Sequence, residues 1–328
     1  MNSTINSNTT AQPHPAITVK GLDKSFGFFR RKQVLNNLDF SVPQHSIVGF
    51  LGPNGAGKTT TLRILLGLIP LKKGDVSILG NSLPAGHAVA LEQIGAVVEN
   101  PNFIETMTAR ENLYWFGSLY KPVTKERILE AIGLVGLKDA ADQRFGTFSS
   151  GMKQRLGVAF GILHKPRLLI LDEPTSGMDP AGRVQMRTIL QRIHAEENTS
   201  IFLSSHLLDE VQRLCDYVVI IDNGVTIREG YVKDLLSECQ EHWELRLKDE
   251  QQREQAQQTL SKLAEKGVQF EKSPRGFMLT LGEGDSSLVN KELINAGVDV
   301  VALIPHEASL EDTFIKLTSR EDEEGEAQ

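Results

Sequence analysis

The chain has 328 residues, a formal net charge of −7 and a pI near 5.7, and this acidic balance argues against nucleic acid as the main partner. Its two cysteines, Cys215 and Cys239, are too few for a disulfide framework and are typical of a reducing compartment. No stretch approaches about 18 consecutive apolar residues, so we expect no segment to span a bilayer. Any role at a membrane must therefore depend on a partner.

The first part of the chain combines a polar leader with short strands. Residues 1–15 are rich in Asn, Ser and Thr and lack the basic and apolar regions of a signal peptide, so we expect a disordered leader. Alternating patterns predict strands at 16–20 and 34–42, joined by a basic segment with three aromatic residues. One of these, Phe26, is suited to stack on an adenine ring, although packing at a hairpin tip explains the same residues.

A phosphate-binding loop follows the next strand. The apolar run 46–51 precedes the pattern G-x-x-x-x-G-K-[ST], and a helical pattern comes after it. The loop and the start of the helix consist of Gly52, Pro53, Asn54, Gly55, Ala56, Gly57, Lys58, Thr59 and Thr60. Glycines allow successive backbone N–H groups to surround an anion at the helix N-terminus. We expect Lys58 to reach the terminal phosphates and the Thr59 hydroxyl to bind Mg²⁺, so the sequence predicts nucleoside triphosphate binding.

A helical region is predicted across residues 108–137. It begins with a capping box in which Thr108 and Glu111 satisfy each other's backbone N–H groups. The aromatic run Tyr114-Trp115-Phe116 lies within this region, and we interpret it as part of the core.

Polar residues follow three further apolar strands. The strands predicted at 94–98, 168–171 and 200–205 end at Glu99, at Asp172 and Glu173, and at His206. An aspartate at such a position can hold the Mg²⁺ shell of a bound nucleotide. The adjacent Glu173 can accept a proton from the water that attacks the γ-phosphate, and His206 can contact both that phosphate and Glu173.

Strands and helices alternate from residue 46 to residue 221. This order predicts a mostly parallel sheet covered by helices, with phosphate chemistry at the carboxyl ends of the strands. The run 217–222 closes on Asn223-Gly224, a dipeptide typical of a tight hairpin turn. After it, the order becomes βαββαβ over 237–319, which predicts a small ferredoxin-like domain, and the acidic segment 320–328 is expected to be a solvated tail.

Taken together, these motifs resemble the ATP-binding subunits of ABC transporters. The loop from Gly52 resembles Walker A, the strand ending at Asp172 and Glu173 resembles Walker B, and His206 resembles the switch histidine. The resemblance adds a signature loop at Phe148, Ser149, Ser150, Gly151 and Met152 and a D-loop that contains Ser176 and Asp179. It also places Phe26 at the family's adenine-stacking position, which reverses the hairpin-tip interpretation.

The fold class that the resemblance implies is α/β. We expect a P-loop ABC cassette over 16–236, with a mixed sheet core, an antiparallel β N-terminal part and a helical subdomain at about 103–160. A small α+β domain follows at 237–319.

Two positions depart from the family's commonest pattern. The usual signature is Leu-Ser-Gly-Gly-Gln, and this chain keeps only Ser149 and Gly151 of those five residues. Glu99 stands where the family usually has a glutamine; it can approach Mg²⁺ but cannot donate a hydrogen bond. Both departures resemble the bacitracin, lantibiotic and multidrug export type, as do the runs 99–103 and 108–112.

By the same resemblance, the chain is expected to hydrolyse ATP with Mg²⁺, which would be held by Thr59, Asp172 and Glu99. A chain with one phosphate loop and one signature loop needs a second copy to complete each site. The expected partners are that copy and separate transmembrane permease subunits, at the cytoplasmic face of the membrane, with no nucleic acid.

Two other readings stay open. An importer subunit is poorly separated from an exporter by sequence. A soluble ABC ATPase acting on ribosomes or DNA is a further alternative, but the paired cassettes or long coiled coils typical of those proteins are absent from the sequence.

Overall fold

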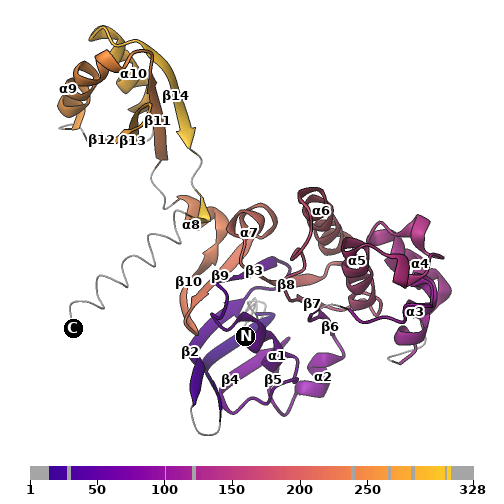
Figure 1. Cartoon of the computed structure of the whole chain (residues 1–328). Coiled ribbons are helices and arrows are strands. Elements are labelled where there is room, and N and C mark those ends of the chain that lie inside the picture. The colour runs from indigo at the N-terminus through magenta and orange to yellow at the C-terminus, as the bar shows by residue number, and fades with distance from the viewer. Residues whose placement is uncertain are drawn as a thin grey trace, which may run out of the picture. The chain divides into compact units, whose positions relative to one another are not determined.

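The computed structural model describes residues 15–27, 31–99, 101–119, 123–237, 241–264, 267–281, 285–306 and 309–311. The chain divides into two compact units, Met1–Tyr231 and Val232–Gln328 (Figure 1). Nearly all of the predicted leader, the whole acidic tail and Cys239 lie outside the described residues. Among the helices that are described, none is both long and apolar enough to cross a membrane.

The first unit begins with an antiparallel sheet of four strands in the order β2-β1-β4-β5. These strands are β1 Ile17–Phe26, β2 Lys32–Val42, β4 Lys73–Ile78 and β5 Asn81–Ser82. Buried and exposed residues alternate along much of β1, as expected for a strand with one face against a core. The predicted antiparallel N-terminal part is thereby confirmed.

The central sheet of the first unit has six strands in the order β10-β9-β3-β8-β7-β6. They are β3 Ile47–Leu51, β6 Ile94–Val97, β7 Leu168–Leu171, β8 Ser200–Ser205, β9 Tyr217–Asp222 and β10 Val225–Tyr231. Strands β3, β6, β7, β8 and β9 run parallel, and only β10 pairs antiparallel. Because β3 and β7 are buried throughout, their sequences are continuous apolar runs and do not alternate, whereas β8, also buried, carries apolar residues only at 201–203.

Helices cover this sheet and connect its strands. The α-helices of the first unit are α1 Lys58–Leu65, α2 His87–Leu91, α3 Ala109–Gly117, α4 Lys125–Leu134, α5 Ser150–Gly161, α6 Pro180–Glu197 and α7 Leu208–Leu214, with short 3₁₀ turns at Lys138–Ala140 and Phe145–Thr147. Phenylalanine rings from three elements, Phe40, Phe50 and Phe202, lie 5.2–5.9 Å apart between centroids and join the two sheets in one core.

Helices α3 and α4 lie beside α5, next to the β6 edge of the central sheet (Figure 1). The predicted capping box is confirmed: Thr108 caps α3, and its side chain and that of Glu111 satisfy each other's backbone N–H groups. The core interpretation of the aromatic run is wrong for Tyr114 and Trp115, which are 52% and 61% exposed. Phe116 does pack, edge-on against Phe103. Successive helical residues point about 100° apart, so three in a row cannot share one buried face.

The second unit begins with α8 Val232–Ser237 and then has the order βαββαβ. Its elements are β11 Glu241–Leu247, a 3₁₀ turn at Glu250–Gln252, α9 Arg253–Ala264, β12 Gln269–Ser273, β13 Gly276–Leu281, α10 Asp285–Asn295 and β14 Val300–His306. The strands form an antiparallel sheet in the order β12-β13-β11-β14, the split βαβ arrangement. Leu245, Leu260, Phe277 and Leu293 are among the residues of its own core.

Candidate active site

The phosphate loop leaves the buried strand β3 and ends where α1 begins. Gly57 caps α1 with a φ of 108°, a left-handed conformation that glycine adopts without strain. A Cβ at this position would lie 2.4 Å from Cδ2 of the buried Leu35, so a larger residue would force Leu35 to move. The helix N-terminus therefore presents free backbone N–H groups to the adjacent pocket, where an anion is stabilised.

A pocket of about 830 Å³ lies against this loop. The predicted site residues that line it are Phe26, Asn54, Gly55, Ala56, Gly57, Lys58, Thr59, Thr60, Glu173, Ser176 and His206. The structure thus brings together side chains from segments that lie far apart in the sequence. The pocket is also lined by five residues that the sequence motifs do not single out: Lys32, Gln33, Val34, Asp222 and Asn223.

Lys58 is held by the loop that precedes it. Its Nζ donates to the carbonyl oxygens of Gly52 and Pro53, at 2.7 and 3.2 Å, and lies 3.5 Å from Oε1 of Glu173. The side chain is only 6% exposed. These hydrogen bonds and the ion pair with Glu173 fix the ammonium group of Lys58 in the phosphate pocket.

Asp172 and Thr59 bring together two oxygen-bearing side chains that would suit a cation. The Thr59 hydroxyl donates to Oδ1 of Asp172 at 3.3 Å, and the hydroxyl of Ser204 donates to the same oxygen at 2.6 Å. No group of three or more His, Cys, Asp or Glu residues suited to a metal exists among the described residues. Two hard oxygen ligands fit Mg²⁺, because this ion keeps several waters and takes further ligands from substrate phosphates.

Glu173 and His206 form a pair at the mouth of the pocket. Nδ1 of His206 lies 2.6 Å from Oε2 of Glu173. Glu173 has a φ of 48°, which is uncommon for a residue with a side chain, and its N–H donates to Oγ of Ser204 at 2.9 Å. The hydrogen bonds at both ends of Glu173 hold its carboxylate where a water molecule can be oriented and deprotonated.

Phe26 also lines the pocket. Its ring is 42% exposed, and Nζ of Lys24 lies 5.4 Å from the ring centroid. A lysine over one face leaves the opposite face available for a planar base, and stacking on a phenylalanine ring suits an adenine.

Glu99 does not join this pocket in the structure. It has a φ of 67° and forms an ion pair with Arg63 of α1. Its side chain is exposed to solvent, and neither Thr59 nor Asp172 is among its hydrogen-bond partners. The structure therefore separates Glu99 from the other two residues that were expected to hold the cation.

Comparison with known proteins identifies the family. The ABC transporter family profile matches residues 35–176. An uncharacterised ABC transporter ATP-binding protein of Bacillus subtilis, YdbJ, is 38% identical over 312 residues, covering 95% of this chain and 98% of that protein. The chain belongs to the ABC transporter ATP-binding family. The resemblance inferred from the motifs is confirmed, and the protein is an ABC ATPase.

Other relatives and solved structures agree. The bacitracin transport ATP-binding protein BcrA of Bacillus licheniformis is 37% identical over 302 residues, with 92% of this chain and 96% of that protein covered. An ATP-binding subunit of an ABC transporter has a TM-score of 0.58 at 30% identity, over 68% of this chain and 92% of that one. CbiO1 of Clostridium perfringens has a TM-score of 0.62 at 24% identity, over 69% and 92%, and it supports the fold alone. The predicted ABC cassette fold is confirmed.

The signature loop of this ABC ATPase lies apart from its phosphate loop. Ser149 caps α5 and accepts a hydrogen bond from the N–H of Met152 at 3.3 Å, while Phe148 is buried. A separate cavity of about 440 Å³ is lined by Ser149, Ser150, Gly151 and the D-loop residue Asp179, among others. No residue from 148 to 152 lines the phosphate pocket of the same chain.

The D-loop connects the two cavities. Ser176 lines the phosphate pocket, whereas Asp179 lines the signature cavity and caps α6 by accepting from the N–H of Gly182 at 3.0 Å. The segment between them therefore runs from one cavity to the other.

Ser204 contacts two of the predicted site residues, although no sequence motif singles it out. It is fully buried at the carboxyl end of β8 and contacts both Asp172 and Glu173. A hydroxyl at the polar end of an apolar strand, two residues before the switch histidine, is the only sequence signal for it.

Proposed function

We propose that this protein is the ATP-hydrolysing motor subunit of an ABC exporter and that it works as a dimer with separate transmembrane subunits. The observation that supports the dimer is the division of the site: the phosphate pocket contains Lys58 and Glu173 but no signature residue. The signature residues line a second cavity elsewhere on the same unit. A two-fold pairing of copies places each signature against the other copy's phosphate pocket.

In this arrangement, the nucleotide is held by both copies. The oxygen of the Ser149 hydroxyl already accepts from Met152, so its own hydrogen is available to donate to a γ-phosphate. Lys58 and the N–H groups of the phosphate loop stabilise the same negative charge from the other side. Because the phosphate is the bridge between the copies, ATP stabilises the dimer and its hydrolysis weakens it.

Glu173 and His206 supply the chemistry of the hydrolysis step. Glu173 accepts a proton from the attacking water, and His206 keeps the carboxylate in place and contacts the γ-phosphate. Thr59 and Asp172 are the residues that would hold Mg²⁺, which neutralises phosphate charge when bound. Phe26 positions the base.

Export is supported by the names of the relatives. They include a bacitracin transport ATP-binding protein and, at 35% identity over 67% of this chain, the linearmycin resistance ATP-binding protein of Bacillus subtilis. The Nod factor export ATP-binding protein I of Rhizobium sp. (strain N33) is 38% identical over 226 residues, which cover 68% of this chain. We place the protein at the cytoplasmic face of the membrane, attached through its permease.

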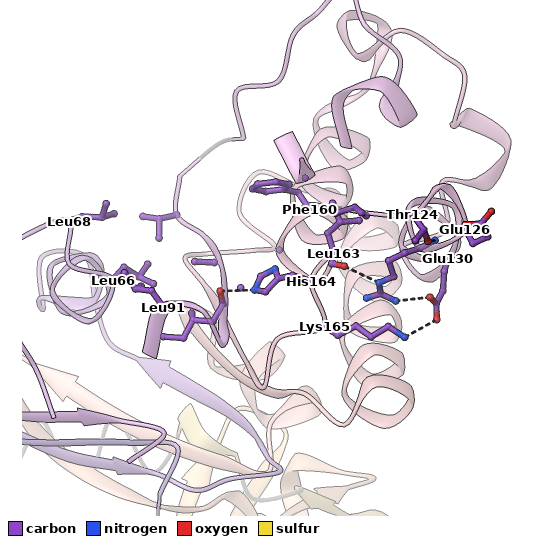
Figure 2. Close-up of a pocket in the computed structure, with 18 residues that line it drawn as sticks. Leu66, Leu68, Leu91, Thr124, Glu126, Glu130, Phe160, Leu163, His164 and Lys165 are labelled. Atoms are coloured by element: carbon purple, nitrogen blue, oxygen red, sulfur yellow. Dashed lines mark hydrogen bonds and ion pairs between the residues drawn. The ribbon is translucent and has the colours of Figure 1, made fainter. Parts of the chain in front are cut away.

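A groove of about 860 Å³ is the surface that we assign to the permease. Figure 2 shows Leu66, Leu68 and Leu91 on one side of it and Phe160 and Leu163 on the other. Charged residues at the rim include Glu126, Glu130 and Lys165. An apolar floor with a charged rim fits an amphipathic helix of a membrane partner. Val98, next to Glu99, also lines the groove, so an occupant of the groove can influence the loop that holds the Arg63–Glu99 pair.

The dimer is tested by Glu173→Gln, which removes the proton acceptor but keeps the shape of the side chain. With Mg-ATP this variant should elute as a dimer in size-exclusion chromatography with light scattering, and with Mg-ADP as a monomer. A monomer in both conditions refutes the proposal.

A complementation experiment tests the exchange of site halves. A Cβ at Gly151 meets no atom within 4 Å, so Gly151→Asp is tolerated within one copy and acts only across the interface. Lys58→Ala and Gly151→Asp should each abolish ATPase activity alone. Mixing them should restore activity, because a mixed dimer contains one site with both halves intact. No recovery in a mixture that contains mixed dimers counts against the shared site.

The groove is tested by Leu68→Asp. Leu68 is 65% exposed, so the fold and the ATPase activity of the isolated subunit should be unchanged. Co-purification with the transmembrane subunits should fall, and an undiminished yield of the complex would exclude this groove as the docking surface.

A further inference from the structure

A tight turn between β9 and β10 touches both walls of the nucleotide pocket. Asn223 and Gly224 both have positive φ values, 44° and 79°, as a two-residue hairpin turn with the right-handed strand twist requires. The N–H of Gly224 donates to the carbonyl of Ala56 in the phosphate loop at 3.1 Å. The carbonyl of Gly224 accepts from the N–H of Asn36 in β2 at 2.9 Å. Gly224 therefore links the phosphate loop to β2, the strand that carries Val34 in the wall of the pocket.

The turn is also packed closely against β2. A Cβ at Gly224 would lie 2.3 Å from the carbonyl oxygen of Val34 and 2.9 Å from Cα of Leu35, both of them backbone atoms. Leu35 in turn fills the space against Gly57 of the phosphate loop. The turn thus contacts both β2 and the phosphate loop, and β2 contacts the phosphate loop through Leu35.

The contact continues along β10, which lies beside β2 (Figure 1). The Thr226 hydroxyl donates to the carbonyl of Asp39 at 2.6 Å, and the N–H of Ser41 donates to Glu229 at 2.9 Å. These bonds anchor the turn to β2 at a distance from the pocket, so a change at Gly224 has to be absorbed locally, between Val34 and Ala56.

We infer that Gly224 is a positioning residue that sets the spacing between the base-binding wall, formed by Phe26 and Val34, and the phosphate loop. This inference rests on the nucleotide site proposed above. Gly224 itself does not line the pocket, whereas Val34 and Ala56, which it joins, both do. A nucleotide spans both walls and is sensitive to their spacing; a bare phosphate chain touches one wall and is not.

The test compares ADP with inorganic pyrophosphate, each with Mg²⁺, by isothermal titration calorimetry on the full chain. ADP reaches from Phe26 to the phosphate loop and is not hydrolysed. In Gly224→Ala, the added Cβ forces Val34 away, so the Kd for ADP should rise by about tenfold or more. The Kd for pyrophosphate should stay within about twofold of the wild-type value. Equal weakening of both ligands, or weakening of neither, overturns the inference.

Gly80→Ala is the matched control. Gly80 has a φ of 81°, close to that of Gly224, but a Cβ there meets no atom within 4 Å. Backbone strain from the positive φ is therefore similar in the two variants, whereas the contact is present only at Gly224. Gly80→Ala should leave both affinities unchanged; a loss of ADP affinity equal to that of Gly224→Ala assigns the effect to general strain and refutes the positioning role.

A measurement on the wild-type protein covers the case in which Gly224→Ala does not fold. Amide hydrogen exchange at Asn36, whose N–H donates to Gly224, should slow with ADP and stay unchanged with pyrophosphate. Equal slowing by both ligands contradicts the inference. Failure of the nucleotide site itself is distinguishable, because then ADP binding would not depend on Lys58 at all.

Discussion

Replacing Ser204 by alanine should lower the rate of ATP hydrolysis by more than the loss of folding stability accounts for. The hydroxyl of Ser204 donates to Oδ1 of Asp172 at 2.6 Å and accepts from the N–H of Glu173 at 2.9 Å. Its removal leaves a carboxylate and a backbone N–H without this partner in a site where Ser204 is fully buried. Each loss costs about 1–3 kcal/mol, so we expect the free energy of unfolding to fall by about 3 kcal/mol.

The effect on catalysis follows from the backbone of Glu173. Its φ of 48° is uncommon, and the hydrogen bond to Ser204 helps to hold the residue in that conformation. Without it, the carboxylate is no longer fixed relative to the attacking water. A general base contributes about 10²–10⁴-fold to the rate, so partial misplacement should lower kcat by about 10–100-fold. The KM for ATP should change less than kcat, because Lys58 and the phosphate loop are untouched and only Asp172, which would hold Mg²⁺, loses a contact.

Ser200→Ala provides the matched control at the other end of the same strand. Ser200 is also buried, and its hydroxyl accepts from the N–H of His45 at 2.9 Å. This variant should lose about 1–2 kcal/mol of stability and keep its kcat. Steady-state ATPase assays and urea unfolding on both variants give the comparison. The reasoning is refuted if the two variants lower kcat equally, or if Ser204→Ala keeps the wild-type kcat.

Three further predictions concern stability. Arg127 of α4 pairs with the nearly buried Glu197 at 2.8 Å, so Arg127→Met should cost about 3–5 kcal/mol in urea unfolding, and adding Glu197→Met should recover most of it; no recovery would contradict the pairing. Burial raises the pKa of the Cys215 thiol, so in a Cys239→Ser background a thiol reagent should react at the rate of local unfolding, whereas a rate like that of free cysteine would exclude this burial. Hydrogen bonds from the capped helix start lower the pKa of Glu111 from 4.5, so the stability it provides is present above that pH and is lost as the pH falls through its lower folded value; Glu111→Gln should flatten this acid dependence in thermal melts, and an unchanged slope would count against it.

Much of the fold could be predicted from the sequence, because the patterns that specify it involve residues close together in the chain. The capping box of Thr108 and Glu111 joins residues three apart, and the Asn223-Gly224 turn needs only two residues that tolerate positive φ. The continuous apolar runs of the parallel strands have the same origin, since burial on both faces removes the need for alternation.

The exposure of Tyr114 and Trp115 could not be predicted from local sequence patterns. A helix pattern reports which residues share a face, but whether a neighbour covers that face depends on contacts distant in sequence. The same applies to Glu99, whose partner Arg63 lies 36 residues earlier on another element. The charge of Glu99 follows from its residue type, but its partner depends on the fold.

The sequence by itself determined the phosphate loop and the family, because the loop's chemistry depends on glycine conformations, one lysine and one threonine within a single strand-loop-helix. The tertiary structure decided how that loop is supported. Ser204 reaches Asp172 and Glu173 from another strand, and Gly224 contacts the loop and β2 through backbone atoms. Backbone contacts leave no side-chain pattern, so only the folded chain reveals them.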